Sequence, residues 1–312
     1  MKHNLNVTIL LLSIFLLTQV FGLYLIKADI TNIIELDDGI VVRHGDTTLG
    51  ERPEMEGSAS FIYLVSAILF GTLLILLIMK YGKVNIWKTW FFIAVFLSMS
   101  VSLGVLVNFK IAFFLAFIFA LLKMFKRTSL IHNLTEILVY SGIALLIVPL
   151  LDLFWASMLL IVISLYDLYA VWQSKHMIKM AKFQTKSEIF AGLNIPYMKT
   201  NKTLKTKKST TKKSSKSKLV ELSLPKPSKS RNAILGGGDV AFPLIFSGVA
   251  MEHLIKLSIV PEFAFIKAVI MSLVITIALG LLFKYAKKDK FYPAMPFVSA
   301  GCFIGLLIVL II

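Results

Sequence analysis

The chain has 312 residues, of which 57% are hydrophobic, and its mean hydropathy is +0.83. These values exclude an ordinary water-soluble domain, in which about 45–50% of the residues are apolar. The single cysteine, Cys302, excludes an intrachain disulfide framework. Most of the net charge of +16 lies in residues 173–232, which alone carry +14. We interpret this charge as the mark of one membrane face, not of a nucleic-acid partner.

Nine apolar stretches approach the ~20 residues that a helix needs to span the hydrocarbon core. They cover residues 7–26, 59–79, 90–107, 111–125, 131–151, 154–172, 236–255, 263–283 and 292–312. The first is too long for the apolar part of a signal peptide, which has about 7–15 residues, so we expect it to be a retained span. The sequence therefore predicts an all-α integral membrane protein with nine transmembrane helices.

The fourth stretch is short, because only the twelve residues from Ile111 to Leu122 precede Lys123. Such a helix must tilt little, thin the bilayer, or extend Lys110 and Lys123 to the two membrane surfaces. Glu136, in the fifth stretch, is expected near the inner surface and in contact with water.

Charge predicts the orientation, because cytoplasmic loops collect Lys and Arg. Residues 27–58 hold three basic and eight acidic residues, whereas the loops after the second, fourth, sixth and eighth stretches are basic. We therefore place the N-terminus in the cytoplasm and the C-terminus outside. The chain divides into residues 1–172 with spans one to six, a cytoplasmic loop at 173–235, and residues 236–312 with spans seven to nine.

The cytoplasmic loop has three predicted parts. Residues 175–183 are amphipathic and are expected to lie along the inner leaflet. Residues 200–218 form a Lys/Ser/Thr-rich tract that we expect to be disordered. A short strand is expected at residues 219–224.

Two aspartates interrupt the apolar pattern. Asp167 follows Tyr166 near the end of the sixth stretch, and Asp239 follows three glycines, Gly236, Gly237 and Gly238, at the start of the seventh. A charged side chain in the bilayer costs at least ~2.5 kcal/mol, so an intramembrane aspartate indicates function. Both aspartates are predicted one to one and a half turns inside the cytoplasmic boundary, so their depths match.

A third irregularity falls in the same layer. Pro293, Ala294, Met295 and Pro296 open the ninth stretch, and two prolines at a helix entry loosen its first turn and expose backbone carbonyls. Irregular backbone at this depth is tolerated where protein buries it or where it lines a wet cavity. The two aspartates and the proline segment are therefore predicted to meet.

Hydrolysis by a carboxylate pair is the chemistry that fits. Two carboxyls about 3 Å apart cannot both ionise, so they share one proton. The charged member then deprotonates water while the neutral member donates to the scissile carbonyl. The three glycines would let a substrate backbone approach closely.

The motifs Tyr166-Asp167, Gly236-x-Gly238-Asp239 and Pro293-Ala294-Met295 resemble the YD, GxGD and PAL motifs of the presenilin and signal peptide peptidase family of intramembrane aspartyl proteases. The resemblance covers all nine stretches. It implies that Asp167 and Asp239 are catalytic and that the substrate is a transmembrane helix.

The resemblance also implies neighbours for the catalytic pair. Pro293, Ala294 and Met295 are expected beside it, and Tyr166 is expected to border it. Together with Gly236, Gly237 and Gly238, these residues are predicted to bind the substrate. The basic cytoplasmic loop is similar to that of the presenilin branch. Met295 replaces the leucine of the motif, a change that nearly conserves volume and leaves backbone contacts available.

Alternative interpretations remain open at this point. Asp239 alone would suit a helix N-cap, and Asp167 alone a proton relay. The chain could therefore be a proton-coupled transporter, or a prepilin-peptidase-like protease that also carries GxGD. His132, His176 and His253 lack metal-ligand spacing, and we expect neither a metal nor an organic cofactor. The expected partners are the bilayer of the cell membrane and transmembrane substrates; a homo-oligomer stays open.

Overall fold

The computed structural model describes residues 5–37, 39–52, 55, 57–81, 84–126, 128–171, 190–197, 231–286 and 292–312. Within these residues the chain forms nine α-helices and a short 3₁₀ helix, η1 (Val148–Leu150). The α-helices are α1 (Leu5–Asp29), α2 (Ser58–Lys80), α3 (Val84–Gly104), α4 (Phe109–Phe125), α5 (Ser129–Ile147), α6 (Leu153–Tyr169), α8 (Gly237–Lys256), α9 (Pro261–Tyr285) and α10 (Met295–Ile311). Each one overlaps one of the nine predicted stretches.

Six of the helices, α1, α2, α3, α5, α8 and α9, are long and apolar enough to cross a membrane. The shorter helices α6 and α10 are also apolar. The chain is therefore a mostly helical integral membrane protein. That all nine helices cross the bilayer, with the N-terminus in the cytoplasm and the C-terminus outside, remains a prediction.

Two small antiparallel sheets depart from the predicted all-α fold. Strands β1 (Ile30–Leu36) and β2 (Gly39–His44) form one hairpin, and β3 (Gly192–Tyr197) pairs with β4 (Arg231–Gly236). Gly39 has a φ of +132°, which favours glycine at the tip of the first hairpin. Both sheets continue directly from or into a helix. The predicted amphipathic segment, disordered tract and strand at 219–224 lie outside the described residues.

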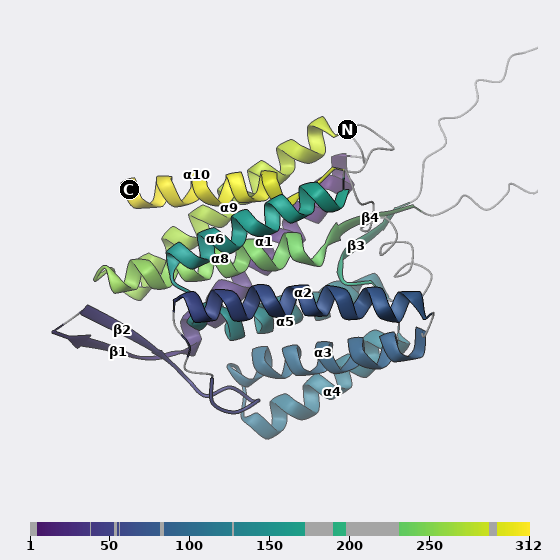
Figure 1. The fold of residues 1–312 in the computed structure, drawn as a ribbon, viewed down its shortest axis with the longest axis horizontal. Helices are drawn as coiled ribbons and strands as arrows, with labels where there is room; N and C mark the ends of the chain where they lie inside the picture. Colours follow the sequence, from purple (N-terminus) through teal and green to yellow (C-terminus); the bar gives the residue numbers. More distant parts are fainter. Residues whose placement is uncertain are drawn as a thin grey trace, which may run out of the picture.

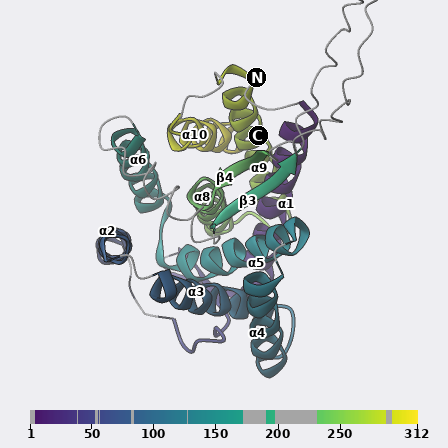
Figure 2. The same cartoon turned by 90° about the vertical axis from the view of Figure 1, so that its right-hand side faces the viewer.

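Helix α8 occupies the centre of the bundle (Figures 1 and 2). It contacts α1, α5, α6, α9 and α10, and most of its side chains are buried. By contrast, α2 lies at the edge (Figure 2) and is largely exposed, as expected of a helix that faces lipid. The helix that carries Asp239 is therefore the one that most of the bundle surrounds.

The structure corrects the expectations for Lys123 and Glu136. Lys123 does not reach a surface, and Glu136 is not in water: their side chains are 3% and 1% exposed. They form an ion pair between α4 and α5, with 2.5 Å between Nζ and Oε1. Each charge is neutralised by the other, so both can be buried in an apolar bundle.

A second buried charge cluster lies at the far end of α8 from Asp239. His44 Nδ1 is 3.0 Å from Asp29 Oδ2, and His44 Nε2 is 2.9 Å from Glu252 Oε1. Arg52 Nη2 lies 2.6 Å from the same Asp29 oxygen. Burial opposes the charged imidazole, but the hydrogen bonds to Asp29 and Glu252 prevail and raise the pKa of His44 to about 9. The cluster joins the β1–β2 hairpin to α1 and α8.

Candidate active site

Asp167 and Asp239 lie in neighbouring helices. Asp167 is in the last turn of α6 and Asp239 in the first turn of α8, and they are 5% and 8% exposed. Helices α6 and α8 are in contact, and the two carboxyl groups are near enough for their charges to interact. The structure thus brings together two aspartates that are 72 residues apart in the sequence.

The proline segment joins the same place through its backbone. The N–H of Met295 donates a 3.1 Å hydrogen bond to Oδ2 of Asp167. Met295 begins α10, and its N-cap residue Ala294 provides no side-chain cap. Asp167 therefore satisfies an N–H group that the first turn of α10 leaves without a helical partner. The proline segment was expected to expose carbonyls; the contact that it makes with Asp167 is an N–H donor.

A second polar contact joins the same two helices one turn away. The hydroxyls of Ser164 in α6 and Ser299 in α10 are 2.6 Å apart, and both residues are buried. Each serine lies one turn from the Asp167–Met295 hydrogen bond. The two contacts together fix how α6 lies against the start of α10.

The three glycines before Asp239 have different surroundings. Gly236 is the N-cap of α8, and its backbone hydrogen-bonds the side chain of Asp239. Asp239 is thus the third residue of the helix, reaching back toward the cap, and not the N-cap itself. A Cβ added to Gly236 would lie 3.1 Å from Oδ2 of Asp239, whereas one added to Gly238 would meet the ring of Phe242 at an ordinary 3.5 Å.

Gly237 lies against a residue that the sequence analysis did not single out. A Cβ at this position would be 2.7 Å from the hydroxyl oxygen of Tyr140, which is buried in α5. A side chain at Gly237 would therefore collide with Tyr140. This contact explains on steric grounds why the variable position of the GxGD motif is a glycine in this chain.

Helix α5 also holds the strand pair that leads to Asp239. His132 Nε2 is 2.8 Å from the carbonyl oxygen of Gly192, and the side chain of Asn133 pairs with the backbone of Asn194. In the sequence His132 stands as an isolated histidine. Its spacing to Glu136 and Tyr140, four and eight residues on, places all three on one helix face and was the available signal.

The remaining predicted residues are placed as follows. Tyr166 is 43% exposed, unlike its buried neighbour Asp167. Pro293 is buried immediately before the first turn of α10. Among the described residues, no group of three or more His, Cys, Asp or Glu side chains has an arrangement that could hold a metal ion. Binding roles for Tyr166, Pro293 and Ala294 remain predictions.

The comparison with known sequences bears on the identity of the chain. The sequence pattern of the family described as "Signal-peptide peptidase, presenilin aspartyl protease" matches residues 12–312. The chain belongs to this family of aspartyl proteases. Among curated proteins, no sequence matches the chain. Since the match covers almost all of the sequence, the family resemblance is confirmed beyond the three short motifs.

Solved structures of presenilin-family proteases share the fold. One, titled "Structure of a presenilin family intramembrane aspartate protease in C222 space group", has a TM-score of 0.59 and 15% identity over 96% of this chain and 98% of that chain. A second, "Structure of a presenilin family intramembrane aspartate protease in P2 space group", has a TM-score of 0.57 and 14% identity, with 96% of each chain covered. At such low identity these likenesses show the fold alone.

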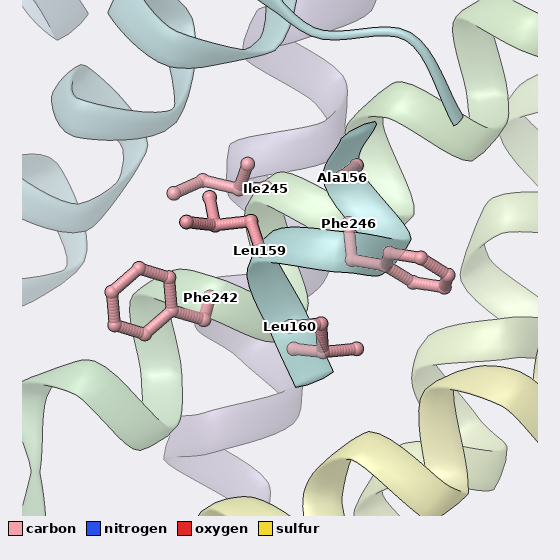
Figure 3. A pocket seen from close by; sticks show the side chains of 6 residues that line it. All are labelled: Ala156, Leu159, Leu160, Phe242, Ile245 and Phe246. Atoms are coloured by element: carbon pink, nitrogen blue, oxygen red, sulfur yellow. The ribbon is translucent and has the colours of Figure 1, made fainter. Parts of the chain in front are cut away.

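A small apolar pocket lies between the two aspartate-bearing helices of this family member (Figure 3). Its lining comes from α6 and α8: Ala156, Leu159, Leu160, Phe242, Ile245 and Phe246. Phe242 is three residues beyond Asp239, and Leu160 is seven residues before Asp167, so the pocket lies farther along both helices than the two aspartates, which do not line it. The space between α6 and α8 at that level is apolar.

Proposed function

We propose that the protein is an intramembrane aspartyl endopeptidase in which Asp167 and Asp239 form the catalytic pair. Membership in the presenilin and signal peptide peptidase family supports the reaction class. The observation that carries the residue assignment is the convergence of α6, α8 and α10, where both aspartates are buried in contacting helices and Met295 donates to Asp167.

The chemistry follows from sharing one proton between two carboxyls. The ionised member takes a proton from a water molecule, and the resulting hydroxide attacks the scissile carbonyl carbon. The protonated member donates to the carbonyl oxygen as the tetrahedral intermediate forms. As the intermediate collapses and its C–N bond breaks, the carboxyl that took a proton from water gives it to the leaving amine, and a hydroxyl of the intermediate returns a proton to the other carboxyl, so the pair regains its starting state. The Met295 N–H holds the Asp167 carboxyl in a fixed orientation throughout.

The proposed substrate is a transmembrane helix of another protein. Peptide hydrolysis requires an extended backbone, so the helix must unwind locally where it reaches Asp167 and Asp239. Gly238 is exposed beside Asp239, and a residue without a side chain allows such a backbone to approach. An apolar pocket lies farther along the same two helices, α6 and α8. A position near the inner membrane surface, as predicted from the charge pattern, would let water reach the carboxyls.

The decisive experiment is cleavage of a single-span model peptide by the purified protein, with products mapped by mass spectrometry. Wild-type protein is expected to cut within the apolar segment, and a transition-state-mimicking hydroxyl compound should block the products. Asp167→Ala, Asp239→Ala and the corresponding Asn variants are each expected to be inactive, because no pair is left to share the proton. Cleavage that survives either single replacement would remove the assignment.

A further inference from the structure

One face of α5 carries polar residues that the proposed mechanism does not use. Asn133 and Tyr140 are buried, and His132 is partly buried. His132 and Asn133 contact strand β3, which pairs with β4, and Tyr140 contacts the first residue of α8, the helix that holds Asp239. We call His132, Asn133 and Tyr140 the α5 clamp.

The first level of contact is with strand β3. The Asn133 side chain donates to the carbonyl oxygen of Asn194 at 3.0 Å and accepts from its N–H at 2.9 Å. One side chain thus reproduces the pair of hydrogen bonds that a neighbouring strand would supply. His132 adds the 2.8 Å contact to the carbonyl oxygen of Gly192.

Strand β3 transmits this position to Asp239 through β4. In the antiparallel register Gly192 is opposite Gly236, and Asn194 is opposite Ile234. Gly236 is both the last residue of β4 and the N-cap of α8, whose backbone bonds Asp239. An isolated two-stranded sheet is only marginally stable. The hydrogen bonds from α5 therefore supply an anchor that the strand pair lacks by itself.

The second level of contact is with α8 itself. The Tyr140 hydroxyl fills the space that a side chain at Gly237 would occupy. Glu136, one turn earlier on α5, is paired with Lys123 of α4. The buried Tyr140 hydroxyl therefore limits, by packing, where the backbone two residues before Asp239 can lie.

We propose that the α5 clamp positions Asp239, with Asn133 and Tyr140 as positioning residues for the proteolytic reaction. The clamp acts through backbone: Asn133 fixes β3 and hence Gly236, and Tyr140 fixes Gly237. This inference rests on the proposed function for its catalytic consequence, but its structural part stands independently. A misplacement of about 1 Å at a reacting group can reduce a rate by about 100-fold, so this anchoring matters for catalysis.

Asn133→Ala tests the first level, with Ser141→Ala as the matched control. Ser141 is a buried polar residue of the same helix, but its hydroxyl bonds only the carbonyl of Ile137 in that helix. Hydrogen exchange measured by mass spectrometry is expected to rise in the peptide covering residues 231–240 for Asn133→Ala and to remain at the wild-type level for Ser141→Ala. Hydrogen exchange does not depend on catalysis, so this measurement tests the structural role of Asn133 even if the protein cleaves no substrate.

The kinetic arm uses a single-span model peptide in detergent. Asn133→Ala is expected to lower kcat by about ten- to 100-fold while KM changes by less than about threefold, because the clamp orients a reacting group and does not touch substrate. Asn133→Asp, which keeps the acceptor for the Asn194 N–H, should recover part of kcat. Unchanged exchange together with wild-type kcat in Asn133→Ala would overturn the role of Asn133.

The second level is tested by introducing a steric clash and then removing it. Gly237→Ala puts a methyl carbon 2.7 Å from the Tyr140 oxygen, so it should lower kcat strongly. Adding Tyr140→Phe removes that oxygen and leaves ring carbons 3.1 and 3.2 Å from the new Cβ, which small shifts can accommodate. The double variant is therefore expected to be more active than Gly237→Ala alone. Full activity of Gly237→Ala with Tyr140 intact, or no gain in the double variant, would refute the contact as a positioning device. Hydrogen exchange at residues 231–240 should follow the same order.

Discussion

The backbone N–H of Met295 donates a 3.1 Å hydrogen bond to the carboxyl of Asp167, which lies 128 residues earlier in the chain. Through this bond the proline segment holds the carboxyl of Asp167. Pro293 and Pro296 have no N–H of their own, and Met295 between them directs its N–H at the buried carboxyl. The contact uses backbone atoms, so the identity of the side chain at position 295 has little influence on it.

Met295→Leu is accordingly expected to keep cleavage activity within about twofold of wild type, since the two side chains are nearly equal in volume. Met295→Pro removes the N–H and is expected to lower kcat by about ten- to 100-fold, as the loss of a positioning contact can do. Ala294 has helical dihedral angles, which a following proline disfavours. Thermal unfolding of both variants must therefore be measured alongside peptide cleavage. Equal kcat values for the two variants would contradict the role of the N–H.

Gly236 and Gly238 are expected to respond differently to alanine. A methyl group on Gly236 would lie 3.1 Å from the Asp239 carboxyl, so Gly236→Ala should lower kcat by displacing a reacting group. Gly238→Ala meets only an ordinary contact with Phe242 and should leave the thermal unfolding temperature unchanged or slightly higher, because alanine favours helix. Its exposed position predicts a raised KM instead. Steady-state kinetics on one model peptide separate the two effects, and identical profiles would count against the distinction.

The Lys123–Glu136 pair is expected to stabilise the bundle only while both partners are present. Lys123→Met or Glu136→Gln alone leaves one buried charge without its counter-ion, which typically costs about 3–5 kcal/mol. The double variant Lys123→Met/Glu136→Leu should recover most of that loss. Thermal unfolding in detergent gives the comparison, with Lys110→Met, at the exposed start of α4, as the control. A double variant no more stable than the singles would show that the pair is not coupled.

The contacts of His44 with Asp29 and Glu252 predict that the stability of the folded protein depends on pH. The pKa of His44 is raised from 6.5 to about 9 in the folded protein. Its contribution is therefore fully present below about pH 6.5 and is lost as the pH rises through about 9, with an upper limit of ~3 kcal/mol. The unfolding temperature of wild-type protein should fall across this window, and that of His44→Gln should change less. A steeper fall in His44→Gln than in wild type would contradict the assignment.

The helices could be predicted because each one is a long run of apolar residues, and both lipid and the bundle interior require apolar side chains. The β1–β2 hairpin was not predicted, although Ile33, Ile34, Val41 and Val42 are typical strand residues. The hairpin lies within residues 27–58, where eight acidic residues dominate the pattern and indicate a loop outside the membrane. The strand pair β3–β4 joins residues on either side of a long basic segment, and no local pattern in the sequence specifies that pairing.

Some residues of the candidate site could likewise be predicted from the sequence, and others could not. Asp167 and Asp239 stand out because a carboxyl within an apolar run is costly, and matching depth suggested that they meet. Asn133 and Tyr140 are ordinary residues of an apolar helix when seen in sequence, and they become significant only through the backbone that they touch. Lys123 and Glu136 were each expected to seek water, because a sequence shows two isolated charges and does not show that they pair.

The buried contact between Lys123 and Glu136 also has a consequence for biosynthesis. A lysine at the centre of a transmembrane helix costs roughly 2.5–3.5 kcal/mol on insertion scales, and Lys123, in the last turn of α4, carries a smaller cost of the same sign. Its counter-ion lies 13 residues later, in the next helix, so α4 emerges from the ribosome before its charge can be neutralised. We therefore expect α4 to wait at the translocon and to enter the lipid together with α5 as a helical hairpin. A nascent chain halted short of Glu136 would leave α4 uninserted.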